Sequence, residues 1–347
     1  MKKYFIILFA ACQSAAAFAQ DYNSRALYFT KSLAGEAISS VLVTTSAGGI
    51  SVSGQSGQQA RVEVYIKGNN GRDLSKEEIK KRLEEDYDMD ITVTGHELTA
   101  VVKNKHNFSN WHRSMSISFK IFVPRQVSTN LKTSGGGIHL DNLTGEENFT
   151  TSGGGLEIDR LNGTVRGRTS GGGIDVSNSG DDIDLTTSGG GIVAKNCNGK
   201  IRLVTSGGGL RLENLKGNIN AHTSGGGVEG YNIDGELVTG TSGGGIDLKG
   251  LSCSLDANTS AGSLSAEFKQ VGKYARLSAS AGNIDLLLPL KQGLDLNLRG
   301  ESINQHPRSI SNFSGQWEKN RVNGSVNGGG ASVTASASSG NVDVRFN

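Results

Sequence analysis

The chain has 347 residues, of which 50 are glycine and only 3 are proline. A disordered low-complexity segment rich in both residue types is therefore excluded. The 35 basic and 33 acidic side chains give a net charge of +2, which falls to zero without Lys2 and Lys3, so the totals exclude a broad basic surface for nucleic acid or anionic membrane.

The first element in chain order is an export signal. Lys2 and Lys3 precede an apolar run at 4–11, and Ala17-Phe18-Ala19 has the small-x-small pattern of a signal peptidase site. We predict a signal peptide over 1–19 and a mature chain from residue 20 that lacks a transmembrane segment. Lipid attachment at Cys12 is the alternative to this cleavage. The mature protein is expected at the cell surface, in the outer envelope or outside the cell, with the periplasm as the alternative.

A short helix is predicted at about 75–87. Ser75 followed by Glu78 forms a capping-box pattern, and Leu74 with Ile79 fits a hydrophobic staple. Ile79 and Leu83 place one apolar stripe on an otherwise charged helix.

Strands are expected on both sides of a polar loop, Lys105–Arg113. This loop concentrates aromatic residues in a chain that has only 6% of them. We therefore predict Phe108, Trp111 and His112 as exposed binding residues. The alternative is that Trp111 packs back onto the first strands.

The central part of the chain repeats every 18 residues. Seven identical TSGGG copies begin at Thr133, Thr151, Thr169, Thr187, Thr205, Thr223 and Thr241. Counting each Thr as position 1, apolar residues recur at positions 6 and 8 around a mostly polar position 7, and again at positions 11 and 15. Such alternation predicts strands with one buried face, and stacking of the repeats would close a continuous core.

We predict an all-β fold, a single parallel β-helix or solenoid domain over 20–347. Irregular coils with the helical insertion would span 20–132, regular repeats 133–276, and degenerate coils with a cap 277–347. The string VTTSAGGISVSG at 43–54 is an early copy, and 278–289 and 336–346 are late ones. Trp317 is expected to help cover the C-terminal end.

Two residue types mark the corners of the expected coils. The glycines at positions 3 to 5 would permit unusual backbone angles and close approach. Position 10 is asparagine in five repeats, which suits a left-handed turn and a ladder of side-chain amides between coils. These asparagines are Asn142, Asn178, Asn196, Asn214 and Asn232. The sequence leaves open which member of each Thr-Ser pair points inward.

The cysteines of the mature chain, Cys197 and Cys253, fall three coils apart in this register. Three strand spacings amount to about 14 Å, which exceeds the reach of a disulfide. We predict two free thiols, with Cys197 acting as a small core residue.

The SGGG-x-apolar coils, the segment SISFKIFVPRQVSTNLKTSGGGI and an insertion closing in RLEEDY resemble the bacterial "putative-adhesin" family of exported β-strand-repeat proteins, a domain of unknown function. The resemblance covers essentially the mature chain. It implies a single-domain, right-handed β-helix and supplies no catalytic residues.

No motif indicates a catalytic, metal or cofactor site, and none is predicted. The acids at position 7 are mixed with His139, Val193 and Arg211, unlike a calcium-binding β-roll. TSGGG lacks the GK[ST] and the helix of a phosphate-binding loop. A polysaccharide-acting β-helix enzyme would need clustered acids, for which Asp159 with Asp175, or Asp247 with Asp256, are the candidates.

The function hypothesis is an exported, non-enzymatic β-solenoid that acts as an adhesin-like binding or structural module of the cell surface or envelope. Its partner would be a cell-surface, glycan or envelope component, with no nucleic acid. The alternatives are a polysaccharide-acting β-helix enzyme and a periplasmic protein with a structural or sensing role. Ice binding by a threonine array and calcium binding are weaker alternatives.

Overall fold

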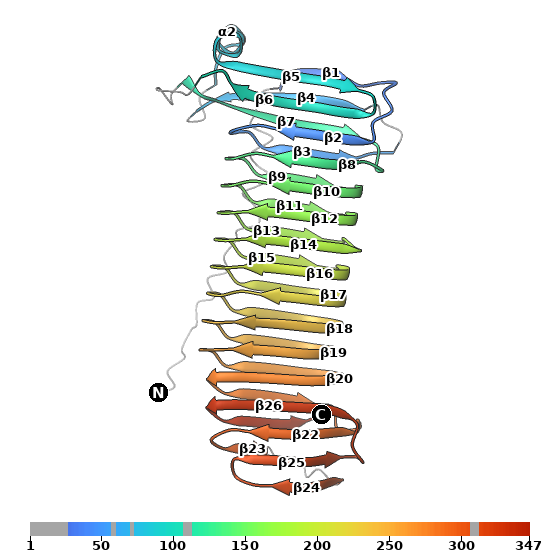
Figure 1. Ribbon diagram of the computed structural model, residues 1–347, viewed down its shortest axis with the longest axis vertical. Coiled ribbons are helices and arrows are strands. Elements are labelled where there is room, and N and C mark those ends of the chain that lie inside the picture. The colour runs from blue at the N-terminus through green and yellow to red at the C-terminus, as the bar shows by residue number, and fades with distance from the viewer. Residues whose placement is uncertain (1–26, 57–59, 70–72, 107–112, 306–311) are drawn as a thin grey trace, which may run out of the picture.

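The structure is a computed structural model that describes residues 27–56, 60–69, 73–106, 113–305 and 312–347. The described chain forms a rod of stacked coils, with a short helix at one end (Figure 1). Each regular coil contributes one strand to each of two opposite faces of the rod, here called face A and face B. In the later regular coils the two strands merge into one long strand that runs through both faces.

Face A carries positions 6 to 9 of each repeat. From the helix end onward, its strands are β1 (Leu27–Ser32), β4 (Arg61–Gly68), β7 (Met115–Val123), β3 (Ile50–Gly54), β9 (Ile138–Asp141), β11 (Leu156–Asp159), β13 (Ile174–Ser177), β15 (Ile192–Lys195), the first parts of β17 (Leu210–His222), β18 (Val228–Thr241), β19 (Ile246–Thr259) and β20 (Leu264–Ala281), then β21 (Ile284–Leu288), β27 (Val342–Phe346) and β23 (Ile303–Gln305).

Face B carries positions 12 to 19. Its strands in the same direction are β5 (Tyr87–Thr94), β6 (Glu97–Asn104), β2 (Ser40–Thr44), β8 (Ser128–Lys132), β10 (Thr144–Thr150), β12 (Asn162–Thr169), β14 (Asp182–Thr187), β16 (Asn198–Thr205), the second parts of β17 to β20, then β26 (Ala331–Ser339), β22 (Leu294–Arg299), β25 (Arg321–Val326) and β24 (Phe313–Trp317).

The core lies between the two faces. The apolar residues at positions 6, 8, 11 and 15 join one continuous buried cluster. Position 17 forms a further buried column, in which side chains of different size stack on one another. Phe149 covers Gly167, where an added Cβ would lie 2.3 Å from the phenyl ring. The ring of Phe149 therefore fills the space that the glycine leaves, which keeps the packing dense at this level of the column.

The Thr-Ser pair divides its side chains between the inside and the outside. Thr151 is 1% exposed, and its hydroxyl donates to the carbonyl oxygen of Gly136 in the previous coil at 2.7 Å. Ser152 is exposed. The same threonine bond recurs from coil to coil, for example from Thr205 to Gly190.

The glycines of TSGGG are required for close approach between coils. A Cβ on Gly208, at position 4, would lie 2.3 Å from the carbonyl oxygen of Gly190 in the previous coil. None of these glycines has a backbone φ in the left-handed region. The expectation of unusual backbone angles at TSGGG was wrong, because the left-handed residues of the coil lie at positions 10 and 13.

Position 10 is left-handed and carries the amide ladder. Asn196 donates to Asn178 at 3.2 Å, Asn214 to Asn196 at 3.0 Å, and Asn232 to Asn214 at 3.1 Å. The φ angles of these four asparagines lie between 50° and 55°. Asparagine tolerates this conformation, and the stacking lets each amide pair with its neighbour.

Both ends of the rod depart from chain order. The early copy at 43–54 lies against the regular repeats, because β2 pairs with β8 and β3 with β9. The insertion then builds the outermost strands beyond it. At the other end β26 lies between β20 and β22, and β27 between β21 and β23, so the last coil of the chain is enclosed by earlier ones.

The outer strands also depart from the parallel arrangement. At the helix end, the pairs β1 with β4, β4 with β7 and β5 with β6 are antiparallel, and at the other end so are β22 with β25 and β24 with β25.

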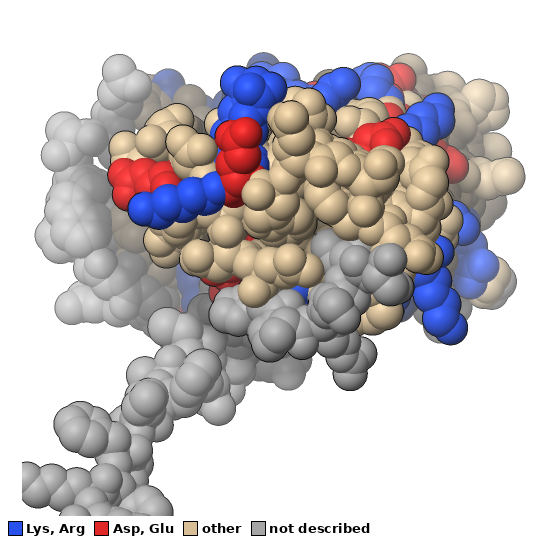
Figure 2. Space-filling view, turned by 90° about the horizontal axis from the view of Figure 1, so that it is seen from below, with Lys and Arg blue, Asp and Glu red and all other residues tan. Residues whose placement is uncertain are grey.

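Aromatic residues help to cover the C-terminal end. Within the described residues, Phe313 and Trp317 of β24 make an edge-to-face contact and pack against the core. Figure 2 shows this end as mainly uncharged, with charged side chains toward its edges.

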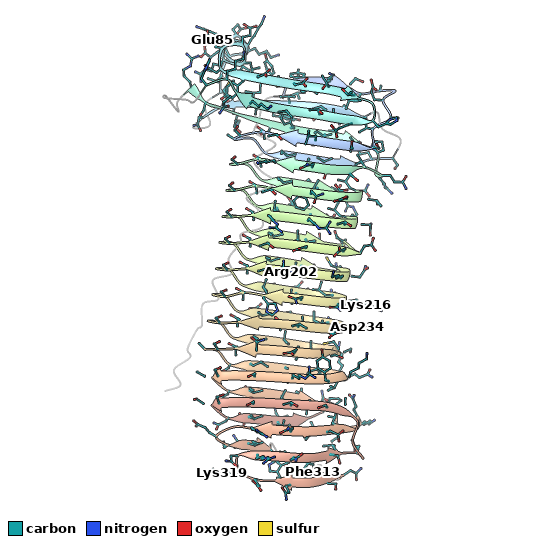
Figure 3. The ribbon with its side chains drawn as sticks, viewed as in Figure 1. Glu85, Arg202, Lys216, Asp234, Phe313 and Lys319 are labelled. Carbon is teal, nitrogen blue, oxygen red and sulfur yellow. The ribbon has the colours of Figure 1, made fainter. Side chains whose placement is uncertain are left out.

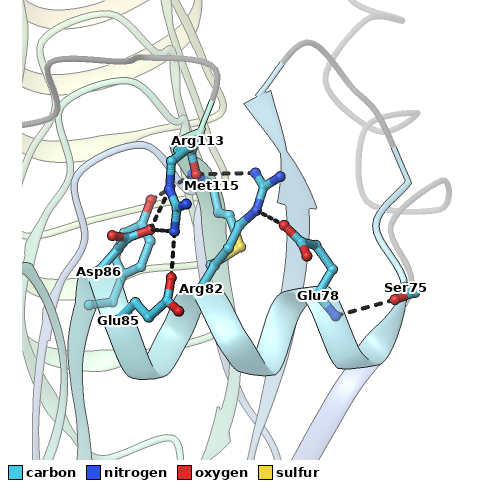
Figure 4. Close-up of polar contacts among 8 residues, drawn as sticks. Ser75, Glu78, Arg82, Glu85, Asp86, Arg113 and Met115 are labelled. Carbon is cyan, nitrogen blue, oxygen red and sulfur yellow. Dashed lines mark hydrogen bonds and ion pairs between the residues drawn. The ribbon is translucent and has the colours of Figure 1, made fainter.

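Helix α2 (Lys76–Asp86) begins at the expected cap. The Ser75 side chain accepts a hydrogen bond from the Glu78 amide at 3.2 Å. The Glu78 carboxylate pairs with Arg82 at 2.6 Å, as in Figure 4, so it serves an ion pair along the helix. Arg113 then fastens the chain to the last turn through Glu85 and Asp86, at 2.7 and 2.9 Å.

Candidate functional site

The three predicted binding residues, Phe108, Trp111 and His112, lie outside the described residues. The chain resumes at Arg113, whose guanidinium is held by the carboxylates of helix α2. Sequence position alone therefore supports them, and they stay a prediction.

A groove of about 540 Å³ runs along face A over five successive coils. Its floor is the backbone of the position-5 glycines, including Gly209 and Gly227. The position-7 side chains form its wall: Val193, Arg211, Glu229, Asp247 and Ser265. The groove exists because the position-5 glycines carry no side chain, whereas the position-7 residues beside them do.

The charges along this wall are paired. Arg211 bonds to Glu213 and lies 3.6 Å from Glu229, while Lys249 contacts Asp247 at 2.8 Å. The guanidinium of Arg211 lowers the pKa of the Glu213 carboxyl. Exposed pairs of this kind contribute little to stability, but they give the groove polar groups of both signs.

Tyr231 is a half-buried aromatic residue beside the groove. Its ring centroid lies 5.8 Å from the Arg211 guanidinium carbon and 5.9 Å from the Lys249 ammonium. An aromatic surface flanked by hydrogen-bonding charged groups suits a polar ligand with apolar faces.

The acid pairs considered for polysaccharide cleavage differ in their geometry. Asp247 lies on face A and Asp256 on face B, so that pairing was wrong. Adjacent strands of face A carry Asp159 and Asp175. Although burial opposes it, hydrogen bonds from Asn178 and Ser177 hold the pKa of Asp159 below its usual range.

Asp175 behaves in the opposite way. Desolvation on the crowded strand face and the neighbouring Glu157 carboxylate raise its pKa. Opposed pKa shifts are common in acid–base pairs, but they also arise wherever one carboxylate is hydrogen-bonded and its neighbour faces another acid. In the described part of the chain, no group of three or more His, Cys, Asp or Glu residues is arranged to hold a metal ion.

Cys197 and Cys253 are free and buried. Burial raises the pKa of the Cys253 thiol to about 12 and also raises that of Cys197. A thiol needs its thiolate form to react, so both cysteines are packing residues.

A family model described as Toastrack DUF4097 matches residues 38–345. The chain belongs to this family. A search among curated proteins found no match. Across the described residues of this Toastrack chain, no helix has the length and apolar character needed to cross a membrane.

Several solved structures are similar to this Toastrack chain. One is described as a "putative cell adhesion protein" from Clostridium sporogenes (9% identity, 92% of this chain, 98% of that chain, TM-score 0.20). Another is a "putative adhesin" from Bacteroides fragilis (15% identity, 74% and 96%, TM-score 0.36). A third is a "putative lipid binding protein" from Parabacteroides distasonis (14% identity, 91% and 96%, TM-score 0.31).

The Toastrack core contains one acid that the sequence reasoning missed. Glu147 occupies position 15, which is apolar in most repeats, and its side chain is 0% exposed. The Thr129 hydroxyl donates to one of its oxygens at 2.5 Å, and the other oxygen has no hydrogen-bond partner among the described residues. Burial raises the pKa of Glu147 to about 7. An alignment of the repeats at position 15 would have identified Glu147 as an acid in an apolar column.

Proposed function

We propose that the protein is an exported, non-enzymatic β-solenoid that binds a surface or envelope component, with residues 1–19 removed and 20–347 forming one domain. The observation that carries the proposal is the groove on face A, which extends over five coils and is walled by variable side chains. A repetitive concave surface of this kind suits an extended polymer, of which a glycan is the example best matched to Tyr231 and its charged neighbours.

Location is tested by fractionating the producing cell and treating intact cells with protease. Loss of the protein from intact cells would support a surface role. Protection until the outer envelope is opened would favour the periplasmic structural or sensing role instead. Retention in the cytoplasm would contradict the proposal.

Binding is tested on a glycan array with Tyr231→Ala. We expect this change to weaken the strongest array signals about tenfold. The apolar faces of sugar rings gain part of their binding energy by stacking on an aromatic side chain, and this variant removes that side chain. The matched control is Tyr274→Ala, which removes a tyrosine that stacks with Arg276 on face B, where the ring centroid lies 4.4 Å from the guanidinium carbon. Equal signals from both variants would contradict the assignment of glycan binding to Tyr231 beside the groove.

The enzymatic alternative has its own test. Purified protein is incubated with envelope and host polysaccharides, and product chain length is measured. Depolymerisation that disappears in Asp159→Asn would overturn the non-enzymatic proposal and assign the activity to face A.

A further inference from the structure

Two arginines face each other at the C-terminal end of face B. Arg299 of β22 is the direct cross-strand partner of Arg321 of β25. On its other side Arg299 is the partner of Ser336 in β26. Ser336 and the two arginines therefore form one row across three neighbouring strands, and both arginines are exposed.

This pairing opposes the stability of the sheet, because like charges directly opposite each other on paired strands repel. Most arginines of the regular coils are matched with acids instead: Arg160, Arg166, Arg202 and Arg211 have carboxylate partners within 4 Å. Arg168 has no ion-pair partner in the described structure, but it does not lie opposite another arginine, since its cross-strand neighbours are Thr150 and Thr186. Over the ranges that the structure describes, neither Arg299 nor Arg321 has a side-chain hydrogen bond or ion pair. The two guanidinium groups thus retain their full donor capacity.

The arginine row borders a hollow of about 490 Å³. The hydroxyl-bearing residues Ser336 and Ser338 line it, together with Asn320 and one acid, Glu301. Glu301 forms no ion pair with either arginine in the described structure. The lining therefore holds two cations and one acid. Lys319, next to Asn320 in sequence, lies at the same end of the rod (Figure 3), and its charge is balanced by that of the adjacent Glu318.

We propose that this hollow, the arginine site, binds a phosphate or sulfate oxyanion. Guanidinium groups match the geometry of such oxygens and bond to them in pairs. An anion placed between Arg299 and Arg321 would turn their repulsion into two attractive contacts, and the serine hydroxyls could donate to its remaining oxygens. The positive charge is confined to this site, since the chain as a whole has balanced charge. The proposal does not depend on the proposed glycan groove.

The test compares the parent with Arg299→Gln/Arg321→Gln in titration calorimetry with inorganic phosphate and with sulfate. Each lost guanidinium should weaken binding about tenfold, from the usual strength of hydrogen bonds to charged groups. The matched control is Arg168→Gln/Lys200→Gln, which removes two exposed cations of face B that have no ion-pair partner in the described structure and lie far from the hollow. The control should bind like the parent.

A second set of measurements separates the sources of the anion. Vesicles of phosphatidylcholine with and without phosphatidylglycerol are sedimented with each protein. Saturable binding of free phosphate or sulfate that fails only in the double arginine variant supports a soluble anion. Binding to the phosphatidylglycerol vesicles alone, lost in the same variant, supports a phosphodiester headgroup.

Melting temperatures guard against misfolding. The double arginine variant should melt no lower than the parent, because it loses a like-charge contact, and phosphate should raise the melting temperature of the parent but not of the variant. Equal behaviour of the arginine variant and its control with every probe would overturn the proposal.

Discussion

Glu147 replaces an aliphatic residue in a core column, between Thr129 of the preceding coil and Val165 of the next. Burial makes its carboxyl easier to protonate than in water and raises its pKa to about 7 from an ordinary 4.5, although hydrogen bonding from Thr129 acts in the opposite direction. No charged side chain among the described residues contributes to this shift. The proton therefore substitutes for a missing ionic partner.

This residue should make stability depend on pH. Between pH 4.5 and about 7 the folded chain keeps a proton that the unfolded chain releases, so stability falls as pH rises through this window and levels off above it. The full loss is roughly 3 kcal/mol, from 1.36 kcal/mol per pKa unit. Glu147→Gln should remove this component and raise the unfolding free energy at pH 8.

The measurement is urea unfolding at pH 5 and pH 8 for the parent, Glu147→Gln and the control Glu146→Gln. Glu146 is the exposed neighbour on the same strand, so its substitution should leave the difference between the two pH values unchanged. A Glu147→Gln protein with the parent's pH dependence would contradict the assignment.

At the residue scale the sequence predicted the buried columns at positions 6, 8, 11 and 15, the left-handed asparagines and the two free thiols, but not the buried column at position 17. It could not orient the Thr-Ser pair, because a corner residue has no alternation pattern to follow. The arginine row was also invisible, since Arg299 and Arg321 are 22 positions apart and meet only through an antiparallel pairing at the cap.

Among elements, the TSGGG corner depends on one glycine more than on the others. A Cβ at Gly208 would lie 2.3 Å from the Gly190 carbonyl oxygen, whereas at Gly207 the nearest atom, the Gly189 carbonyl oxygen, is 3.2 Å away. The first contact requires the backbones of two coils to separate. The second requires a shift of only a few tenths of an ångström.

Gly208→Ala should therefore cost about 3 kcal/mol of unfolding free energy, at the upper end of overpacking effects, and Gly207→Ala about 1 kcal/mol or less. Denaturant unfolding of both variants under one set of conditions gives the comparison. If the two cost the same, backbone flexibility rather than contact between coils would be the reason for the glycines.

The sequence predicted most elements of the regular block and the helix at Ser75, because both carry strong local signals. It did not predict how the outer strands pair. Strands such as β4 and β25 alternate polar and apolar residues like any others, and nothing in that pattern states whether the neighbour runs parallel or antiparallel. Their direction is set by the turns and insertions that connect them.

At the scale of the whole molecule, the stability of the rod's C-terminal end depends on its last coil, β26 and β27, because earlier strands enclose that coil on both sides. Removing residues 331–347 would take β26 and β27 from between strands that otherwise do not meet. We expect the coils from residue 264 onward to lose hydrogen-exchange protection, while β9 to β12 keep theirs, because contacts in a solenoid are between neighbours.

Hydrogen-exchange mass spectrometry on the shortened and full-length chains would show this difference. Protection that remains unchanged over 264–305 would mean that β20 and β21 are stable without their later partners. The corresponding strands at the helix end, β2 and β3, are present in both chains and serve as the internal reference.

The contacts are the same at every TSGGG corner, so the length of the rod is set by the number of repeats. Each 18-residue copy presents the same backbone surface above and below, so one copy can be removed or duplicated and its neighbours still close with the same threonine and glycine contacts. Every such change alters the separation of the two caps by one strand spacing, about 4.8 Å. The helix-bearing end and the arginine-bearing end thus stand at a distance that duplication of the gene segment can adjust in fixed steps, without redesign of either end.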